Sequence, residues 1–368
     1  MNFGFTEEQE LLRKTARDFL AERAPMSRVR EILDGDSGHS RRLWSALAEL
    51  GWTGLTLPEL HGGAGLSIVE LCIVLEELGR ALTPVPFLPT AMAGCAILEL
   101  GDEVQRFAWL PRIASGACIA TFAVPGDPGS GESDGAVAAE THAGVRLSGC
   151  VEVVPDAASA ELLVVLGRFE DGGEALLLVP ASAAGVQLQP LTGIDRLRPV
   201  SRVELDSVVV PWEAVLPDRE GGVRRVLDRA LVMLSAEMVG GADACLETSV
   251  AYARQRVQFG KPIGVHQAIK HKCADMLFGV ESARSIVYYA AWAAREQVGD
   301  ASVAAAMAKA TASDAFRRAA QDNLQIHGGV GFTWEYDCHL YLKRAKADEM
   351  WLGDAESQRR RIALLLGI

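Results

Sequence analysis

The first part of the chain carries apolar residues at the spacing of an amphipathic helix. Leu12, Ala16 and Phe19 recur after Thr6 and Gln9, a pair that matches a capping box. In a capping box each of the two side chains bonds a backbone N–H that the helix leaves without a partner. The pattern therefore predicts that a first helix begins after Thr6.

Further helical stretches follow before residue 117. Ser67 and Glu70 form a second capping pair, and three prolines between residues 84 and 89 break the chain before the next helix. The loop TLPELHGGAGL, residues 56–66, is either a ligand rim or a plain turn. We expect an all-α domain over residues 1–117. Its later helices are predicted at residues 43–50, 68–82, 91–101 and 104–114.

From Ile119 onward the sequence changes to short runs rich in β-branched residues, separated by glycine, proline and aspartate. The runs are CIATFAV, GVRLSGCVEVV, AELLVVLG, EALLLVP and VSRVELDSVVV. Short strands with frequent turn residues are typical of a β-barrel or β-sandwich. A small β domain is therefore expected over residues 118–216.

After residue 217 the chain returns to helix. One apolar stripe passes through Leu227, Leu231 and Leu234. Two later stretches carry apolar residues at the same helical spacing. These stripes predict a C-terminal four-helix bundle over residues 217–368. The alanine-rich stretch within it suits contact between subunits or packing inside the chain. The expected fold class is mainly α with a small β domain.

Composition limits the classes of partner. The 368 residues are 49% hydrophobic and include 36 basic and 48 acidic residues, which gives a net charge of −12. This charge and the lack of a long basic run argue against nucleic acid, because a phosphate backbone requires a basic track. No segment reaches about 18 uninterrupted apolar residues, so no membrane span is expected.

Cysteine usage and the N-terminal residues indicate the compartment. The seven cysteines are scattered, odd in number and without CxxC spacing, which indicates neither a disulfide framework nor a zinc site. The first residues lack the basic start and apolar run of a signal peptide. A reduced, cytoplasmic protein is therefore expected.

A candidate phosphate-binding corner lies in YARQRVQFGKPIGVHQ, residues 252–267. Arg256, Gln258 and Phe259 are predicted to lie at the C-terminal end of a helix that Gly260 terminates. A guanidinium in this place offers a planar fork of donors to two phosphate oxygens at once. The same residues fit a plain helix corner with a snorkelled arginine equally well.

Two motifs in the C-terminal half resemble the double signature of the acyl-CoA dehydrogenase family. The first, RxxFGxxIxxxQ, runs from Arg256 to Gln267, and the second, QxxGGxGF, runs from Gln325 to Phe332. The resemblance implies FAD as cofactor, with the arginine and phenylalanine on its pyrophosphate. It also implies that the glutamine–glycine–glycine loop reaches the cofactor of a neighbouring subunit, while His327 either touches the cofactor or caps the turn. The cofactor-binding residues implied are Arg256, Gln258, Phe259, Gln267, Gln325, His327, Gly328 and Gly329.

Other motifs of that family are degraded here. Where the family carries Thr-Glu-Pro and later Gly-Ser-Asp, this chain has VPG at residues 124–126 and GESD at residues 131–134. The family strand Ile-Thr-Asn-Gly, which packs on the flavin ring, stands here as VVPD at residues 153–156. Asp354 and Glu356 replace a threonine and a glutamine that usually contact FAD. Carboxylates in these places repel a pyrophosphate unless they are protonated or paired.

The catalytic base is missing from both places that the family uses. Dehydrogenation of a thioester requires a base to remove the α-proton while the flavin accepts the β-hydride. By alignment with the family, the two base positions fall on Leu352 and Ala230, and both are apolar. Asp228, Glu237 and Asp354 are nearby surrogates, each expected to be structural or solvated rather than catalytic. The identity of the base is left open.

Other chemistries fit the sequence less well. His266, His271 and Asp275 do not share one helix face, so no metal site is expected. Ser130 lacks the strand–turn–helix setting of a nucleophile elbow. The glycine pairs at 62–63 and 328–329 do not form GxGxxG after a strand, so no Rossmann site is expected.

The missing base leads to a hypothesis about assembly. The chain resembles the base-lacking subunit of actinobacterial heteromeric (α2β2) acyl-CoA dehydrogenases of steroid side-chain breakdown, in which a paralogous subunit carries the glutamate. The alternatives are a self-sufficient homotetramer with an unrecognised base and a flavin-free scaffold. The resemblance implies acyl-CoA as substrate and electron-transfer flavoprotein as acceptor, and it leaves steroid and fatty acyl groups both open.

Overall fold

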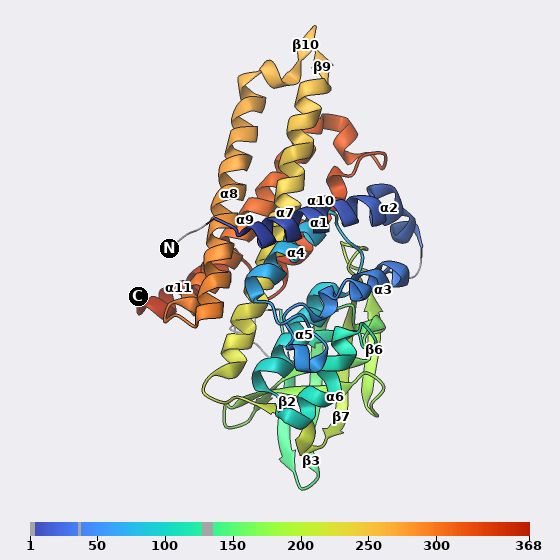
Figure 1. The fold of residues 1–368 in the computed structure, drawn as a ribbon, viewed down its shortest axis with the longest axis vertical. Helices are drawn as coiled ribbons and strands as arrows, with labels where there is room; N and C mark the ends of the chain where they lie inside the picture. The colour runs from blue at the N-terminus through green and yellow to red at the C-terminus, as the bar shows by residue number, and fades with distance from the viewer. Residues whose placement is uncertain (1–3, 36–37, 127–134) are drawn as a thin grey trace. The chain divides into compact units, whose positions relative to one another are not determined.

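The computed structural model describes residues 4–35, 38–126 and 135–368 (Figure 1). Backbone contacts divide the chain into two compact units, a helical unit (Met1–Glu31, Cys72–Thr83 and Leu231–Ile368) and a mixed unit (Ile32–Leu71 and Pro84–Ala230). The helices are α1 (Glu7–Arg23), α2 (Met26–Asp34), α3 (Arg41–Glu49), α4 (Ile68–Arg80), α5 (Phe87–Leu100), α6 (Glu103–Ala114), α7 (Gly222–Gln255), α8 (Gln267–Glu296), α9 (Ala301–His327), α10 (Cys338–Met350) and α11 (Ala355–Leu366).

The secondary structure follows the predicted change from helices to strands and back to helices. Helices occupy the chain up to residue 114, strands follow from residue 120 to residue 217, and helices return at residue 222. The predicted fold class, mainly α with a β region in the middle, is confirmed. The predicted capping pairs also form, because Thr6 accepts from the Gln9 N–H and Glu70 accepts from the Ser67 N–H. The division into domains 1–117, 118–216 and 217–368 stays a prediction.

The mixed unit contains an eight-stranded sheet in the order β6-β7-β3-β2-β4-β5-β8, with β1 parallel to β4. Its core consists of apolar side chains such as Leu147, Val165 and Leu177. Two hydrogen bonds attach the neighbouring helices: Thr90 of α5 donates to Ala120 O, and Gln105 of α6 donates to Val215 O. The strands are β1 (Ala120–Ala123), β2 (Gly135–Thr141), β3 (Gly144–Pro155), β4 (Leu162–Phe169), β5 (Glu174–Pro180), β6 (Val186–Leu191), β7 (Val200–Val210) and β8 (Val215–Pro217).

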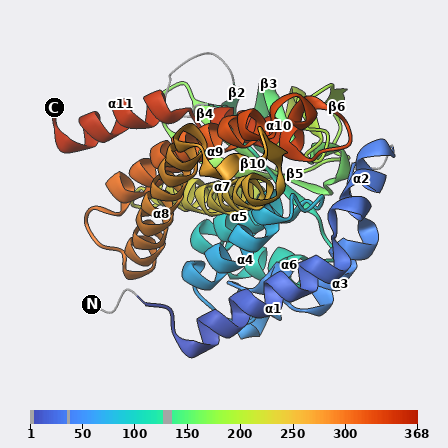
Figure 2. The ribbon, with the colours of Figure 1, turned by 90° about the horizontal axis from the view of Figure 1, so that it is seen from above.

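In the helical unit α8 packs along α9, and α10 and α11 pack against α9 (Figures 1 and 2). The predicted helical C-terminal region is confirmed, but its last helix is in fact two. Met350 ends α10, and Ala355 begins α11. The interruption has a local cause, because Leu352 and Gly353 between them adopt left-handed φ values of 62° and 86°. A residue with positive φ cannot continue a right-handed helix.

Helices α4 and α7 cross so closely that their backbones touch. A Cβ added at Gly240 of α7 would overlap the carbonyl oxygen of Glu76, and one added at Gly79 of α4 would overlap the carbonyl oxygen of Glu237. Glycine is therefore required on both sides of the crossing, for lack of space rather than for backbone freedom.

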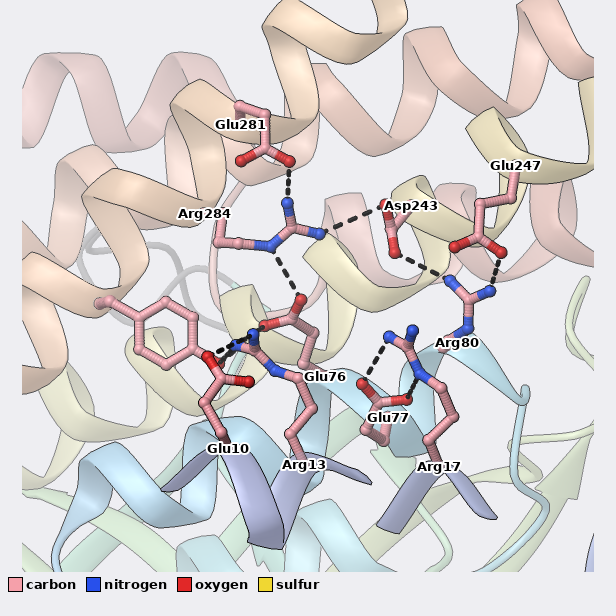
Figure 3. Close-up of polar contacts among 11 residues, drawn as sticks. Glu10, Arg13, Arg17, Glu76, Glu77, Arg80, Asp243, Glu247, Glu281 and Arg284 are labelled. Atoms are coloured by element: carbon pink, nitrogen blue, oxygen red, sulfur yellow. Dashed lines mark hydrogen bonds and ion pairs between the residues drawn. The ribbon is translucent and has the colours of Figure 1, made fainter. Parts of the chain in front are cut away.

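A cluster of charged residues, with Glu76 and Glu77 buried within it, lies at this crossing (Figure 3). Glu77 of α4 receives two hydrogen bonds of 2.8 and 2.9 Å from Arg17 of α1. The neighbouring Glu76 accepts from Arg284 of α8 at 2.9 Å and from the Tyr288 hydroxyl at 2.7 Å. A carboxylate buried without such partners would cost several kcal/mol. The cluster thus fixes α1 and α8 to α4.

The same cluster extends to α7. Arg80, at the end of α4, pairs with Asp243 at 2.8 Å and with Glu247, while Arg284 also lies 3.3 Å from Asp243. Arg13 of α1 also lies 3.9 Å from Glu76, so ion pairs join the four helices α1, α4, α7 and α8. Within the described residues, no helix has the combination of length and apolar character that a membrane span needs.

The α4–α7 crossing generates the first testable prediction. Replacing Gly240 by alanine places a methyl group against the Glu76 carbonyl oxygen, so one helix must move away from the other. Overpacking of this kind lowers the free energy of unfolding by about 1–3 kcal/mol. Urea unfolding of Gly240→Ala, followed by far-ultraviolet circular dichroism, measures the loss.

Gly279→Ala on α8 is the matched control. A Cβ at Gly279 meets only Ala315 Cβ, at an ordinary 3.9 Å. Because alanine is the better helix former, this variant should be neutral or more stable by up to about 1 kcal/mol. Equal stability of Gly240→Ala and the parent protein would contradict the close crossing.

Candidate active site

The arginine-containing motif forms a hairpin rather than a helix end. Helix α7 already ends at Gln255, and two short strands, β9 (Val257–Gln258) and β10 (Lys261–Pro262), pair antiparallel behind it. The prediction that Gly260 terminates the helix is therefore wrong. Phe259 and Gly260 instead form a two-residue turn with φ values of 53° and 74°. Two consecutive positive φ values are typical of the tight turn that connects twisted strands.

The hairpin lies at the tip where the end of α7 meets the start of α8 (Figure 1). Phe259 is 94% exposed, and Arg256, Gln258 and Gln267 are exposed as well. Among the described residues no carboxylate forms an ion pair with Arg256. A phenylalanine held at positive φ and fully exposed gains nothing from its own chain, which is typical of a residue that contacts a ligand or partner.

The second motif lies at the end of α9. His327 is the last residue of this helix, Gly328 follows with a φ of 66°, and Gln325, Gly328 and Gly329 are exposed. A Cβ added at either glycine would meet nothing within 4 Å. The peptide groups of Gly328 and Gly329 are therefore open to close approach by another molecule.

An aromatic contact brings the two motifs together. The ring of Tyr252, one turn before Arg256, stacks on the His327 ring with centroids 4.1 Å apart. His327 is buried, and its Nδ1 donates to Asn323 O at 2.8 Å. Burial lowers the pKa of His327, which disfavours the charged form of the ring. This arrangement gives His327 a role in joining the ends of α7 and α9, while its contact with the cofactor stays a prediction.

Both base positions are buried. Leu352 is 2% exposed and Ala230 is 1% exposed. The surrogate Asp228 is buried and lies 3.7 Å from Arg224, one turn before it on the same helix. Glu237 accepts a 2.8 Å hydrogen bond from the buried Arg344. These two carboxylates thus have charged partners, and their structural role stays a prediction.

Asp354 caps the last helix. Its Oδ1 accepts from the Ser357 N–H at 2.8 Å and from the Ser357 hydroxyl at 2.9 Å. The backbone N–H of Ser357, more than any other group, lowers the pKa of Asp354. Glu356 is exposed and pairs with Arg360 at 3.2 Å. Both carboxylates thus have local partners within the last helix.

The structure describes only some of the residues in the degraded motifs of the β region. Val124 and Pro125 follow β1 and are buried, and Pro155 ends β3. Asp156 after it is buried with a left-handed φ of 55°. Ser130 and the residues 131–134 lie outside the described residues. His266, His271 and Asp275 are exposed, and across residues 4–35, 38–126 and 135–368 no three His, Cys, Asp or Glu side chains come together in a metal-binding group.

Sequence reasoning missed Lys309, which lies fully buried on α9 next to the turn that contains Leu352. The signal was available, because this lysine is a single charge within the run AAAMAKATA. Sequence reasoning also assigned no role to Tyr252, although it opens the arginine motif.

Known proteins match this chain over nearly its whole length. The family profile described as "Acyl-CoA dehydrogenase, N-terminal domain" matches residues 6–117, and the one described as "Acyl-CoA dehydrogenase, C-terminal domain" matches residues 223–366. Acyl-CoA dehydrogenase IpdE2 of Mycolicibacterium smegmatis is 33% identical over 358 residues, which is 97% of this chain and 98% of that protein.

Solved structures agree with this match. A variant of the Tcur3481-Tcur3483 steroid ACAD superposes with a TM-score of 0.91 at 33% identity, with 98% of each chain covered. The ChsE4-ChsE5 complex from Mycobacterium tuberculosis superposes with a TM-score of 0.92 at 30% identity, with 100% of this chain and 99% of that chain covered.

The role of Asp354 as a cap can be tested directly. Asp354→Ala should lower the free energy of unfolding by about 0.5–2 kcal/mol at pH 7, whereas Asp354→Asn should cost less because asparagine also caps. Since the pKa of Asp354 is lowered in the folded state, its stabilisation is present above the unfolded pKa and is lost as the pH falls through the folded pKa. The difference between the parent protein and Asp354→Ala should therefore shrink in acid.

Urea unfolding at pH 7 and at pH values below 4 measures this difference. Full stability of Asp354→Ala at pH 7 would show that the carboxylate is not used as a cap, and Asp354 would then return as a candidate base.

Proposed function

Because this chain belongs to the acyl-CoA dehydrogenase family, whose members are FAD-dependent oxidoreductases that act on CH–CH bonds, we propose that it is one subunit of a heteromeric acyl-CoA dehydrogenase. It completes the FAD site for a paralogous subunit that carries the catalytic glutamate. The observation that carries this proposal is that both base positions, Leu352 and Ala230, hold buried apolar side chains. Neither side chain can accept a proton.

The donor set of the chain fits FAD. Arg256 offers an exposed guanidinium that is not engaged by a carboxylate of the described residues, and such a fork binds two pyrophosphate oxygens. Gly328 and Gly329 leave open space beside their peptide groups, so a cofactor can approach the backbone. When bound, FAD supplies the acceptor for the hydride that leaves the β-carbon of the acyl group.

The proposed tasks of this chain are binding and orientation. Arg256 and Phe259 hold the pyrophosphate, and Gln258 and Gln267 add amide donors from the same hairpin and the start of α8. Gln325 and the two glycines after His327 reach the cofactor of the neighbouring subunit. Removal of the α-proton falls to the glutamate of the partner, because proton transfer requires a titratable group within hydrogen-bond reach.

The cofactor sites of the assembly are proposed to be of two kinds. Asp354 and Glu356 stand where the family places neutral FAD contacts, and both are tied to local partners. Pro155 at the end of β3 provides no backbone N–H for the flavin ring. A site built on these residues lacks several contacts of about 1 kcal/mol each, so it holds FAD poorly.

The similar structures support a second subunit and a substrate class. One is described as a complex of ChsE4 and ChsE5, and the other as a steroid ACAD. We therefore extend the proposal to a steroid-derived acyl-CoA as substrate and to electron-transfer flavoprotein as acceptor.

Co-expression with a paralogue that carries the glutamate tests the assembly. The purified complex should contain about two FAD per four chains, because only one kind of site is complete. Flavin absorbance after denaturation, combined with amino-acid analysis, gives this ratio. One FAD per chain would contradict the two kinds of site, an active flavin-containing homo-oligomer would favour the self-sufficient enzyme, and a flavin-free complex would favour the scaffold.

Arg256 provides a second prediction. Arg256→Ala removes a charge-assisted contact worth about 1.5–3 kcal/mol, so the affinity for FAD should fall by roughly ten- to a hundredfold. Fluorescence titration of the apo complex with FAD measures the change.

Arg254→Ala is the matched control, since Arg254 is also an exposed arginine, lies in the last turn of α7 and stands outside the motif. It should bind FAD with unchanged affinity. Unchanged affinity in Arg256→Ala as well would remove Arg256 from the cofactor site.

A further inference from the structure

Lys309 is a fully buried lysine whose donors are all used. Its Nζ lies 3.1 Å from Ser313 Oγ, 3.1 Å from Glu349 O and 2.9 Å from Gly353 O. An ammonium group has three N–H donors, so no donor is left over. Burial lowers the pKa of Lys309 to about 8, while nearby carboxylates favour its charged form.

Apolar packing of the aliphatic part of the Lys309 side chain does not explain why a lysine occupies this position. The neighbouring positions of α9 are buried alanines, including Ala305, Ala306 and Ala312, so a small apolar side chain suits this part of the helix. Burying an ammonium is costly unless its hydrogen bonds repay the loss of water. The required feature is therefore the charged donor group at the end of the side chain.

The bonded carbonyls border the turn between α10 and α11. Leu352, in the middle of this turn, has a left-handed φ of 62°, a conformation that a leucine rarely adopts. Gln358 of α11 donates to Leu352 O at 2.8 Å. Lys309 holds the carbonyls of Glu349 and Gly353, one on each side of Leu352. Buried side chains thus bind the backbone before, at and after the strained residue.

We propose that Lys309 is the positioning residue of the acyl-site turn, which it holds in its left-handed form through Glu349 O and Gly353 O. The assignment of this turn to the acyl site rests on the proposed function, in which Leu352 occupies a base position of the family. The chain thus keeps the scaffold that presents the acid, although it has lost the acid itself.

The first test observes the turn without any need for activity. Trp351 is buried next to Leu352, and its signal in 5-fluorotryptophan-labelled protein can be assigned with Trp351→Phe. Lys309→Met keeps the length of the side chain and removes the donors. It should shift or broaden the Trp351 fluorine resonance and leave the other tryptophan signals in place. Lys272→Met on α8, which removes a partly exposed ion pair with Asp322, is the control and should leave the Trp351 signal unchanged.

The second test asks whether Lys309 acts through the conformation of Leu352. Glycine adopts a left-handed φ without strain. Leu352→Gly should therefore make the Lys309 hydrogen bonds to Glu349 O and Gly353 O less necessary for the shape of the turn. Lys309→Met lowers the folding equilibrium constant by some factor in the parent protein. In the Leu352→Gly background this factor should be smaller by about fivefold or more. Additive effects of the two substitutions would show that Lys309 only fills and satisfies the interior.

If Lys309→Met does not fold, Gln358→Met probes the same turn through Leu352 O. It should move the Trp351 signal in the same way, and its effect should also be smaller in the Leu352→Gly background.

The third test uses the co-expressed complex. Lys309→Met should leave kcat for acyl-CoA with a dye acceptor close to that of the parent complex, because the glutamate and the complete FAD site belong to the paralogous subunit. Unchanged Trp351 resonances in folded Lys309→Met protein would overturn the proposal. An inactive complex with a clear Trp351 shift would instead contradict the proposed function, while the role of Lys309 in holding the turn would still be supported.

Discussion

The contact between α4 and α7 constrains the helical unit more than any other single feature. At Gly79 and Gly240 the two backbones approach until no side chain fits between them, and Gly241 leaves room for the Phe316 ring of α9 in the same way. Two helices this close have one possible register, so the line of α7 is fixed along its length. The buried carboxylates Glu76 and Glu77 then attract arginines from α1 and α8, and each of these pairs would be expensive to leave half made. Steric fit and paired charge thus hold α7 against its neighbours, and the end of α7 carries the hairpin with Arg256.

The residues that resemble a cofactor site and those at the base positions have opposite environments. Arg256, Phe259 and Gln325 are exposed at the ends of long helices, where only another molecule can cover them. Leu352 and Ala230 are closed off inside the chain. The chain therefore presents its candidate cofactor contacts to other molecules, while neither base position holds a titratable side chain.

Local patterns in the sequence predicted what local physics determines. Capping pairs such as Thr6 with Gln9, the apolar stripe of α7 and the change to strands after residue 119 depend on neighbours in the chain, and all three are found. The hairpin was missed because its turn places Phe259, rather than the usual asparagine or glycine, at positive φ. The ion cluster was invisible because its partners are far apart in sequence, with Glu76 and Arg284 separated by 208 positions. The pairing of Lys309 with the carbonyls around Leu352 depends in the same way on tertiary packing. The two FAD motifs could be recognised by resemblance, but their exposure could not be derived from their spacing.

The central claim is that this chain lacks a base of its own, and turnover by the isolated chain tests it most directly. The purified chain, supplied with FAD, acyl-CoA and a dye acceptor, should reduce the dye no faster than a heat-treated control, whereas the complex with a glutamate-bearing paralogue should be active. Robust turnover by a verified homo-oligomer of this chain alone would contradict the account.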